Sequence, residues 1–352
     1  MYGWEKNVRR VVPYTPGEQP KEQNIIKLNT NENPYPPSPK VEEALRTLPC
    51  EQLRRYPDPA ANPLTGKLAE RYGRKPSEVF AGIGSDDVLA MSFLAFFNDR
   101  EHPVLFPDIT YSFYDVWADL FRIPYETIPL DEAFRIRPEE YRKANGGIVF
   151  PNPNAPTGRA MPLREAEEII ASNPDSVVIV DEAYVDFGAE SAAGLIPKYD
   201  NLLVVQTFSK SRSLAGLRIG YAMGQEKLIG YLNDVKYSFN SYTMNRTAIE
   251  AGCAALADEA YFRESCRKVI ATRERSEQEF ARLGFRFFPS ASNFLFVTHP
   301  EKSAKEIFEA LREKHIYVRY FNKPRIDDYL RISIGTDEEM NTLFEALASI
   351  LA

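Results

Sequence analysis

The chain has 352 residues, of which 44% are hydrophobic and 26% are charged, and its formal net charge at pH 7 is −7. These values are typical of a soluble globular protein that is long enough for one large core and a smaller second one. The acidic balance argues against nucleic acid or an anionic membrane as a partner, because either would require a basic surface.

The cysteines, the histidines and the N-terminus bear on the compartment. Cys50, Cys253 and Cys266 are scattered and odd in number, which favours a reducing compartment over a disulfide framework. Neither they nor the three isolated histidines have metal-ligand spacing, so we expect no metal site. The N-terminus lacks the apolar segment of a signal peptide, and the apolar run at 88–97 falls short of the roughly 20 residues of a membrane span. We therefore expect a cytoplasmic protein that does not enter a membrane.

The first 39 residues predict an extended arm. Residues 11–39 contain seven prolines, which exclude a continuous helix. The arm holds Tyr14, and its polar cluster at 28–34 is typical of a turn.

Between residues 40 and 222 the predicted helices and strands alternate. Short apolar runs predict strands at 79–81, 104–106, 125–128, 148–150, 177–180, 202–205 and 219–222. Helices are predicted at 40–47, 63–72, 88–97, 111–121 and 162–171, with a shorter segment near 191–197. The pattern predicts an α/β domain in which a mostly parallel sheet is sandwiched by helices. Ligands of such sheets bind outside the carboxyl ends of the strands.

The pattern changes after Asn240 and predicts a second, smaller α+β domain. Helices are predicted at 261–283, 303–314 and 338–351, and strands at 293–297, 316–319 and 330–334. We therefore expect an N-terminal arm at 1–39 that joins the small domain, a large domain at 40–244 and a small C-terminal domain at 245–352.

A lysine in a polar loop after a buried strand is the strongest candidate for chemistry. The strand at 202–205 is followed by Thr207, Ser209 and Lys210, and Arg218 follows the same loop. Lys210 could form a Schiff base with a carbonyl cofactor, while the two hydroxyls and Arg218 hold that cofactor's phosphate. Taken alone, a solvated loop lysine is the plainer interpretation.

Two carboxylates end the apolar strand at 177–180. A nucleotide-hydrolase interpretation of this strand needs a phosphate-binding loop, but Ala61 and Leu68 occupy two required positions around the Gly66-Lys67 pair. Alternatively, Asp181 could stabilise a protonated pyridine nitrogen, and Tyr184 could hydrogen-bond the phenolic oxygen of the same ring. A strand-end aspartate that caps the next helix is the structural alternative.

A junction between a strand and a helix is expected at the same edge of the sheet. At Gly84-Ser85-Asp86-Asp87 a strand meets a helix, whose first N–H groups can hold a phosphate. We expect Asp86 to cap this helix with its side chain turned away from the ligand; a plain helix cap is the alternative.

Tyr111, at the start of the next predicted helix, could stack on a flat ring, although a core aromatic is the alternative. The proline-rich turn at 151–158 adds amides to this edge. Four consecutive loops thus supply donors for a phosphate, an acid and an amide that could contact a ring, and an amine.

Read together, these motifs resemble the fold-type-I pyridoxal-phosphate aminotransferases, and over nearly the whole chain the histidinol-phosphate aminotransferases. The matching motifs are Val12-Pro13-Tyr14, Leu28-Asn29 with Asn31-Glu32, Arg55-Tyr56-Pro57, Gly84-Ser85-Asp86, Thr110-Tyr111, Pro156-Thr157-Gly158, Asp181-Glu182-Ala183-Tyr184, Ser209-Lys210 with Leu214-Ala215-Gly216-Leu217-Arg218, and Leu330-Arg331-Ile332-Ser333.

The resemblance implies a role for each matching residue. It makes Lys210 the Schiff-base lysine, Asp181 the partner of the pyridine nitrogen, Tyr184 the contact of the ring hydroxyl and Tyr111 the stacking residue. Ser85, Asp86, Thr207, Ser209 and Arg218 would surround the phosphate of pyridoxal 5'-phosphate. Tyr56 would reach the phosphate in the partner subunit, which implies a homodimer with shared sites.

One position departs from the family. An asparagine that contacts the ring hydroxyl commonly precedes Pro-Thr-Gly, but this chain has Ala155 there. Asn154 is the nearest amide in the sequence, and we expect it to substitute by a small backbone shift.

The resemblance also implies a reaction, namely transamination between histidinol phosphate and 2-oxoglutarate that gives imidazole acetol phosphate and glutamate. The guanidinium of Arg331 could bind a carboxylate through two parallel hydrogen bonds, and Arg319 supplies a second cation that suits a phosphate dianion. Tyr14 and Asn29 could add donors. The alternatives are an aromatic amino acid aminotransferase, a phosphothreonine decarboxylase on the same fold, and a non-catalytic cofactor-binding module.

Overall fold

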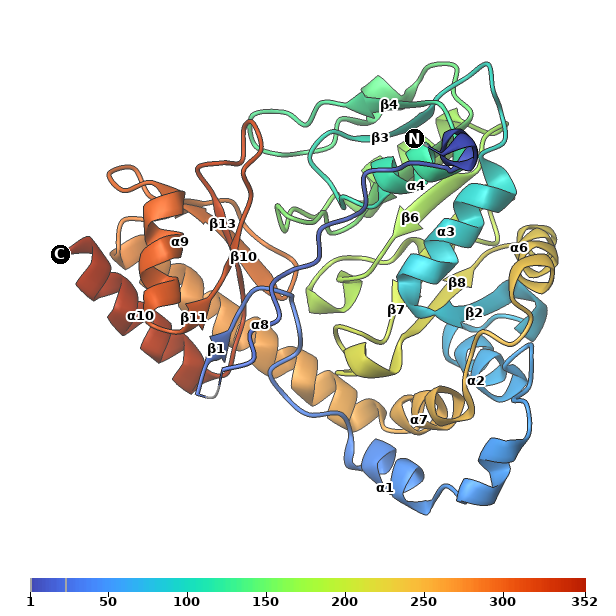
Figure 1. Cartoon of the computed structure of the whole chain (residues 1–352), viewed down its shortest axis with the longest axis horizontal. Coiled ribbons are helices and arrows are strands. Elements are labelled where there is room, and N and C mark those ends of the chain that lie inside the picture. The colour runs from blue at the N-terminus through green and yellow to red at the C-terminus, as the bar shows by residue number, and fades with distance from the viewer. Residues whose placement is uncertain (1, 23) are drawn as a thin grey trace.

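The structure, a computed structural model, describes residues 2–22 and 24–352. Its largest sheet has seven strands in the order β2-β8-β7-β6-β5-β3-β4 (Figure 1). These are β2 (Val79–Ile83), β3 (Val104–Pro107), β4 (Tyr125–Ile128), β5 (Gly147–Pro151), β6 (Val178–Asp181), β7 (Leu202–Thr207) and β8 (Ile219–Met223). Every pairing is parallel except those of β8, which runs antiparallel to β2 and β7. The predicted, mostly parallel sheet is confirmed.

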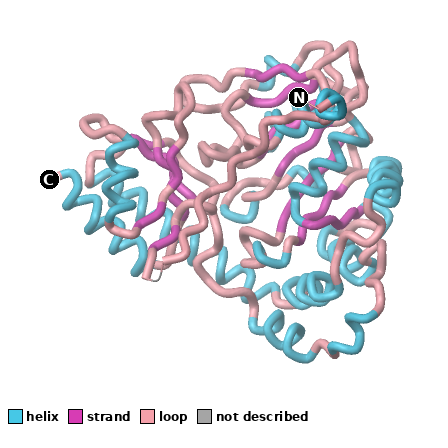
Figure 2. Tube along the Cα trace, viewed as in Figure 1, coloured by secondary structure: helices cyan, strands magenta, loops and turns pink. Residues whose placement is uncertain are grey.

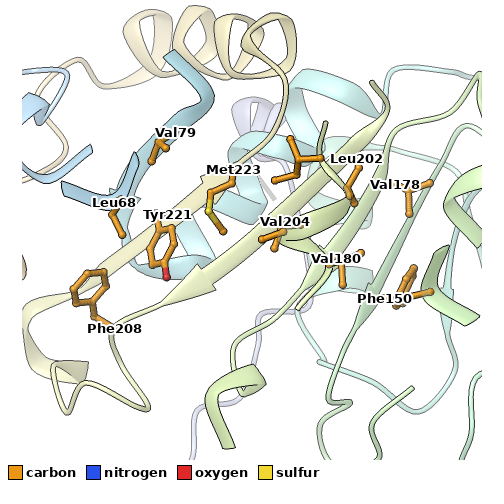
Figure 3. Close-up of a cluster of buried hydrophobic side chains, with 14 of the residues drawn as sticks. Leu68, Val79, Phe150, Val178, Val180, Leu202, Val204, Phe208, Tyr221 and Met223 are labelled. Carbon is orange, nitrogen blue, oxygen red and sulfur yellow. The ribbon is translucent and has the colours of Figure 1, made fainter. Parts of the chain in front are cut away.

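Helices cover both faces of this sheet, because its strands are apolar on both sides. Val178 and Val180 of β6 belong to one buried cluster, and Ile179 between them belongs to the other. Figure 3 shows part of the first cluster. The helices that pack on that side are α2 (Asn62–Tyr72), α5 (Leu163–Ser172) and α7 (Arg246–Leu256). Those on the other side are α3 (Gly84–Phe96), α4 (Tyr114–Phe121) and α6 (Glu226–Phe239).

A four-stranded antiparallel sheet of the order β12-β13-β10-β9 forms the centre of the smaller part. Its strands are β9 (Arg286–Phe287), β10 (Phe294–Thr298), β12 (Arg319–Tyr320) and β13 (Leu330–Ser333). The helices beside it are α8 (Glu259–Arg282), α9 (Ala304–Glu313) and α10 (Asp337–Leu351). They share a third buried cluster with the sheet, which agrees with the predicted α+β character.

The N-terminal arm connects the two parts. Arg9 Nη1 donates to the carbonyl of Leu120 in α4 at 2.5 Å. Further along, β1 (Ile26–Lys27) pairs in parallel with β11 (Ile316–Tyr317). Figures 1 and 2 show the arm passing as a loop from the side of α4 to the small sheet. The predicted extended arm therefore borders the carboxyl ends of the central strands.

Several details differ from the sequence-based expectation. The helices α6 and α7 were not predicted, although Leu228, Ile229 and Leu232 are buried at helical spacing. The strand predicted at 316–319 is two short strands, β11 and β12, which belong to different sheets. Because α7 packs against α2 and α1 (Pro39–Thr47), we propose a domain boundary after α7 rather than at 244.

Short 3-10 helices complete the chain. They are η1 (Gly3–Asn7), η2 (Cys50–Arg54), η3 (Pro76–Glu78), η4 (Pro138–Tyr141), η5 (Val185–Phe187), η6 (Ala192–Leu195) and η7 (Ala215–Leu217). In the part of the chain that the structure describes, no helix has both the length and the apolarity to cross a membrane.

Candidate active site

Two adjoining pockets lie where β6 and β7 end and the arm crosses. The inner pocket is lined mainly by residues at the ends of central strands and in the loops beside them, among them Asp181 at the end of β6 and Arg218 just before β8. The outer pocket is lined by the arm, the small sheet and loops of the large domain, including Asn29, Arg331 and Thr110. The residues that line both are Thr30, Tyr111, Ala155, Tyr184 and Lys210. The amine predicted to do chemistry thus belongs to both pockets.

Lys210 is held in the loop after β7 by the arm. Its Nζ donates to the carbonyl of Thr30 at 3.1 Å. Asn33 Nδ2 donates to the backbone carbonyl of Lys210, also at 3.1 Å. The arm therefore positions both ends of the lysine, a contact that connects residues about 180 positions apart in the sequence.

One end of the inner pocket gathers donors for an anion. Thr207 Oγ1 accepts the amide of Ser209 at 3.0 Å, and Arg218 Nη1 reaches Ser209 Oγ at 3.5 Å. Ser85, at the start of α3, also lines this end. Gly84 has a φ of +82°, and a Cβ there would lie 2.5 Å from Arg218 Nη2. A glycine is needed because the guanidinium packs against the backbone at this point.

Asp86 does not turn away from the pocket, so that expectation was wrong. Its carboxylate accepts the Tyr111 hydroxyl at 2.7 Å and Arg218 Nη2 at 3.1 Å. The neighbouring Asp87 faces backwards instead, and its Oδ2 accepts the amide of Ile83 at 2.9 Å. The two aspartates thus have different tasks. Asp86 orients an arginine and a tyrosine at the pocket, and Asp87 fixes the strand–helix junction.

Asp181 ends β6 at the other end of the inner pocket, where its carboxylate is 4% exposed. It accepts the hydroxyl of Tyr114 at 2.8 Å and the amide of Ala183 at 3.2 Å. Burial raises the pKa of Asp181 to about 6, although these two hydrogen bonds oppose the shift. A cationic ring nitrogen beside this carboxylate would offset the burial.

Tyr111 and Tyr184 lie on the walls shared by the two pockets. Tyr111 is in the turn before α4 and not in the helix itself, and burial raises the pKa of its hydroxyl well above the usual value. The Tyr184 hydroxyl accepts Asn31 Nδ2 at 2.9 Å. Both rings line the inner pocket together with Asp181 and Lys210.

The two predicted arginines meet at the far end of the outer pocket. Arg319 of β12 and Arg331 of β13 are directly paired residues of adjacent antiparallel strands, so their side chains project from the same face. Arg331 Nη2 donates to the carbonyl of Asn29 at 2.9 Å. Tyr14 lines the same pocket and stacks on Phe113. Burial lowers the pKa of the Arg331 guanidinium, and Arg319 adds to this effect.

Two polar atoms at this end of the outer pocket are buried. Among the described residues, neither Arg331 Nε nor Asn29 Oδ1 has a hydrogen-bond partner. A buried donor without a partner is costly, and an anion at this position would satisfy the arginine.

Two predicted residues lie outside both pockets. Asn154 Nδ2 donates to Ile109 O at 2.9 Å and to Thr157 Oγ1 at 3.0 Å, so its amide braces the turn. Ala155, not Asn154, lines the pockets. Tyr56 is 78% exposed and stacks on Tyr242, with ring centroids 4.6 Å apart.

Sequence reasoning gave no role to three residues that hold the site. Asn31 and Asn33 were part of a noted polar motif, whose clustering was the available signal. Tyr114 had no such signal, because nothing distinguishes it from the other aromatic residues of α4. In residues 2–22 and 24–352, no three His, Cys, Asp or Glu side chains are placed to hold a metal ion.

The donor set of the inner pocket fits one kind of group. Hydroxyls and a guanidinium suit a phosphate, a buried carboxylate suits a protonated ring nitrogen, and an amine suits an aldehyde carbon. Gly84 leaves room for the guanidinium that completes the phosphate end. The residues present therefore fit pyridoxal 5'-phosphate.

Comparisons with known proteins agree with this geometry. Residues 23–347 match the family model "Aminotransferase class I and II". The chain is 54% identical to histidinol-phosphate aminotransferase 1 of Hydrogenovibrio crunogenus over 99% of this chain and 98% of that one. It is also 54% identical to the histidinol-phosphate aminotransferase of Aromatoleum aromaticum, over 99% of each chain.

A solved structure shares the fold over most of its length. The histidinol-phosphate aminotransferase of Sinorhizobium meliloti, in complex with pyridoxal-5'-phosphate, matches with a TM-score of 0.82 and 26% identity. The match covers 93% of this chain and 90% of that one. With a family model that spans nearly the whole sequence, the chain belongs to the class I and II aminotransferases and has their fold-type-I architecture.

Proposed function

We infer that this protein transaminates histidinol phosphate with 2-oxoglutarate, using pyridoxal 5'-phosphate, and forms imidazole acetol phosphate and glutamate. Two relatives that cover the full chain at 54% identity carry the name histidinol-phosphate aminotransferase. The observation that carries the substrate assignment is the pair of arginines, Arg319 and Arg331, facing one way at the end of the outer pocket. Two cations suit a phosphate dianion, and Arg331 alone suits a carboxylate.

The cofactor, when bound, supplies a ring that accepts the electron pair released at the amine-bearing carbon of the substrate. Asp181 would keep the ring nitrogen of the cofactor protonated, and Tyr184 would donate to its phenolic oxygen. Tyr111 would contact the ring, and Ser85, Thr207, Ser209 and Arg218 would hold the phosphate, with Asp86 orienting Arg218. The Lys210 amine would accept and return the proton at the amine-bearing carbon of the substrate.

The homodimer predicted from the sequence is part of this proposal. Tyr56 stacks on Tyr242 on an exposed surface and does not line either pocket of its own subunit, which suits a contact with a second copy. Mixing Lys210→Ala protein with Tyr56→Ala protein should restore activity, because one of the two shared sites then holds both intact residues. Failure of the mixture to recover activity, with dimers shown by sedimentation, would reject the shared site. The cytoplasmic location remains a prediction.

An aromatic amino acid aminotransferase is a second candidate, because Tyr14 and Phe321 line the outer pocket beside Arg331. A screen of the first half of the reaction separates the candidates. Histidinol phosphate, phenylalanine and phosphothreonine are offered in turn, and the absorption of the bound cofactor is followed.

We expect bleaching by histidinol phosphate at micromolar to millimolar concentration. A response to phenylalanine alone would favour the aromatic enzyme, and carbon dioxide release from phosphothreonine without a keto acid would favour the decarboxylase.

A further inference from the structure

The missing asparagine at position 155 leaves a question about the ring hydroxyl of the cofactor. The turn at 151–158 offers no free amide to replace it. Asn152 exchanges two hydrogen bonds with the backbone of Met161, at 2.9 and 3.1 Å. Both hydrogens of the Asn154 amide are used by Ile109 and Thr157. A contact to the ring hydroxyl has to be organised from another part of the chain.

Asn31, in the arm, lies beside the ring hydroxyl's other expected partner, Tyr184. Asn31 is 1% exposed, and four hydrogen bonds hold it. Its amide N–H and its Oδ1 contact Ser333 Oγ, at 2.9 and 3.0 Å, and its carbonyl accepts Asn293 Nδ2 at 2.9 Å. The fourth bond runs from Asn31 Nδ2 to the Tyr184 hydroxyl oxygen at 2.9 Å. Its φ of +56° suits asparagine, which adopts the left-handed region more readily than most residues.

The Asn31 amide is bonded at its oxygen by Ser333 and at its nitrogen by Tyr184. The Ser333 hydroxyl oxygen accepts the backbone N–H of Asn31, and its single proton is donated to Asn31 Oδ1. The NH₂ group of the amide faces the Tyr184 hydroxyl. Asn31 thus donates to Tyr184 and leaves the tyrosine proton unused.

In the described part of the chain, no protein group takes up that proton. Among the described residues, none accepts a hydrogen bond from the Tyr184 hydroxyl, and the tyrosine lines both pockets. Lys210 Nζ lies 5.8 Å from the centre of the Tyr184 ring. The hydroxyl is therefore free to donate to a group in the pockets that Tyr184 and Lys210 both line.

We propose that Asn31 is a positioning residue that replaces the absent asparagine indirectly, by holding Tyr184 as an obligate donor to the phenolic oxygen of the cofactor. The proposal rests on the proposed function, because it requires the cofactor at Lys210. Asn31 belongs to the arm and is held by the small sheet, so these two parts of the chain would influence the electronic state of the cofactor. A donor to the phenolic oxygen stabilises its negative charge and weakens its hold on the proton that the bound cofactor and Lys210 share.

The test is a pH titration of the absorption of the bound cofactor, without substrate. Asn31→Gly removes the amide, and glycine tolerates the positive φ. We expect the midpoint of the titration to rise by about half a pH unit to one unit. Asn31→Asp should raise it further, because a carboxylate would accept the tyrosine proton. The other titratable and charged groups that line the two pockets or interact with Tyr184 are unchanged in these variants; they are Tyr14, Glu32, Asp86, Tyr111, Tyr114, Asp181, Lys210, Arg218, Arg319 and Arg331.

Two comparisons make the result decisive. In a Tyr184→Phe background, Asn31→Gly should cause no further shift, since its effect passes through the hydroxyl. Asn173→Gly is the matched control, because Asn173 is a buried amide outside both pockets. It should lower thermal stability without moving the midpoint. If Asn31→Gly fails to fold, Ser333→Ala removes the group that orients the amide and should shift the midpoint in the same direction.

The two proposals fail in different ways. A midpoint unchanged in Asn31→Gly but raised in Tyr184→Phe would overturn the role of Asn31 and leave the proposed function standing. The role of Asn31 would also be overturned if Asn31→Gly shifted the midpoint equally in the wild-type and Tyr184→Phe backgrounds. Wild-type protein that shows no cofactor absorption at all would instead reject the proposed function.

Discussion

The inner and outer pockets differ in how their charges are satisfied. In the inner pocket Arg218 pairs with Asp86, and Asp181 accepts Tyr114. In the outer pocket, among the described residues, Arg331 Nε is buried without a partner. The first arrangement keeps its geometry by itself, which suits a group that stays bound. The second leaves donors for an anion that enters and leaves with each half of the reaction.

We expect the largest loss of activity when Lys210 is removed, because this residue lines both pockets. Lys210→Ala should reduce turnover by about 10³-fold or more, because no other amine lines either pocket in the described part of the chain. Thermal stability should change little, since the side chain makes one hydrogen bond, to Thr30. Lys198→Ala, an exposed lysine outside both pockets, is the control. Near-normal multiple turnover by Lys210→Ala would remove the lysine from the mechanism.

Asp181 tests whether the inner pocket is organised around a ring nitrogen. Asp181→Asn should lower turnover by about 10²-fold at pH 8, because a neutral side chain stabilises a protonated ring less. Burial raises the pKa of Asp181 to about 6, so its carboxylate gains a proton as the pH falls through that value. We therefore expect the affinity of the apoprotein for the cofactor to weaken below about pH 6 more steeply in the wild type than in Asp181→Asn.

Fluorescence titration of the apoprotein with the cofactor, from pH 5 to 8, measures this difference. The cofactor's own phosphate gains a proton in the same range, but it does so for both proteins and cancels in the comparison. Parallel curves for the two proteins would contradict the assigned role of Asp181.

Arg319 tests whether the outer pocket distinguishes a phosphate from a carboxylate. Arg319→Ala should raise the KM for histidinol phosphate by about 10- to 100-fold and that for glutamate by less than about threefold. Arg331→Ala should weaken both substrates. Arg312→Ala, which removes an exposed arginine of α9 paired with Glu18, is the matched control. Equal losses for the two substrates in Arg319→Ala would reject selective recognition of the phosphate.

Gly84 tests the close packing at the phosphate end and has the smallest expected effect. Gly84→Ala would place a Cβ against Arg218 and should weaken cofactor affinity by about tenfold. Gly73→Ala is matched in backbone, with a φ of +61°, but has no atom within 4 Å of the added Cβ. It should lower stability by about 1 kcal/mol without changing cofactor affinity. An equal loss of affinity in both variants would contradict the packing argument.

Much of the inner pocket follows from local sequence. Buried strands are recognisable as apolar runs, and the carboxyl ends of parallel strands meet at one edge, so Asp181 and the Lys210 loop were placed correctly at one rim. Local pattern also predicted a strand–helix junction here, although the helix begins at Gly84 rather than at 88, and Asp87 rather than Asp86 faces backwards. That choice depends on Arg218 and Tyr111, which approach from distant parts of the chain.

The outer pocket was decided by tertiary structure. The pairing of Arg319 with Arg331 is a strand register, and the contacts of Asn31 with Tyr184 and Ser333 span 153 and 302 residues. The side chain of Asn154 faces its own turn, so nearness in sequence to Ala155 did not bring it to the pocket. By itself the sequence determined which residues could do chemistry, because residue type and strand ends are local properties. Their partners were set only by packing, because hydrogen-bond direction and register depend on chain segments that meet in space.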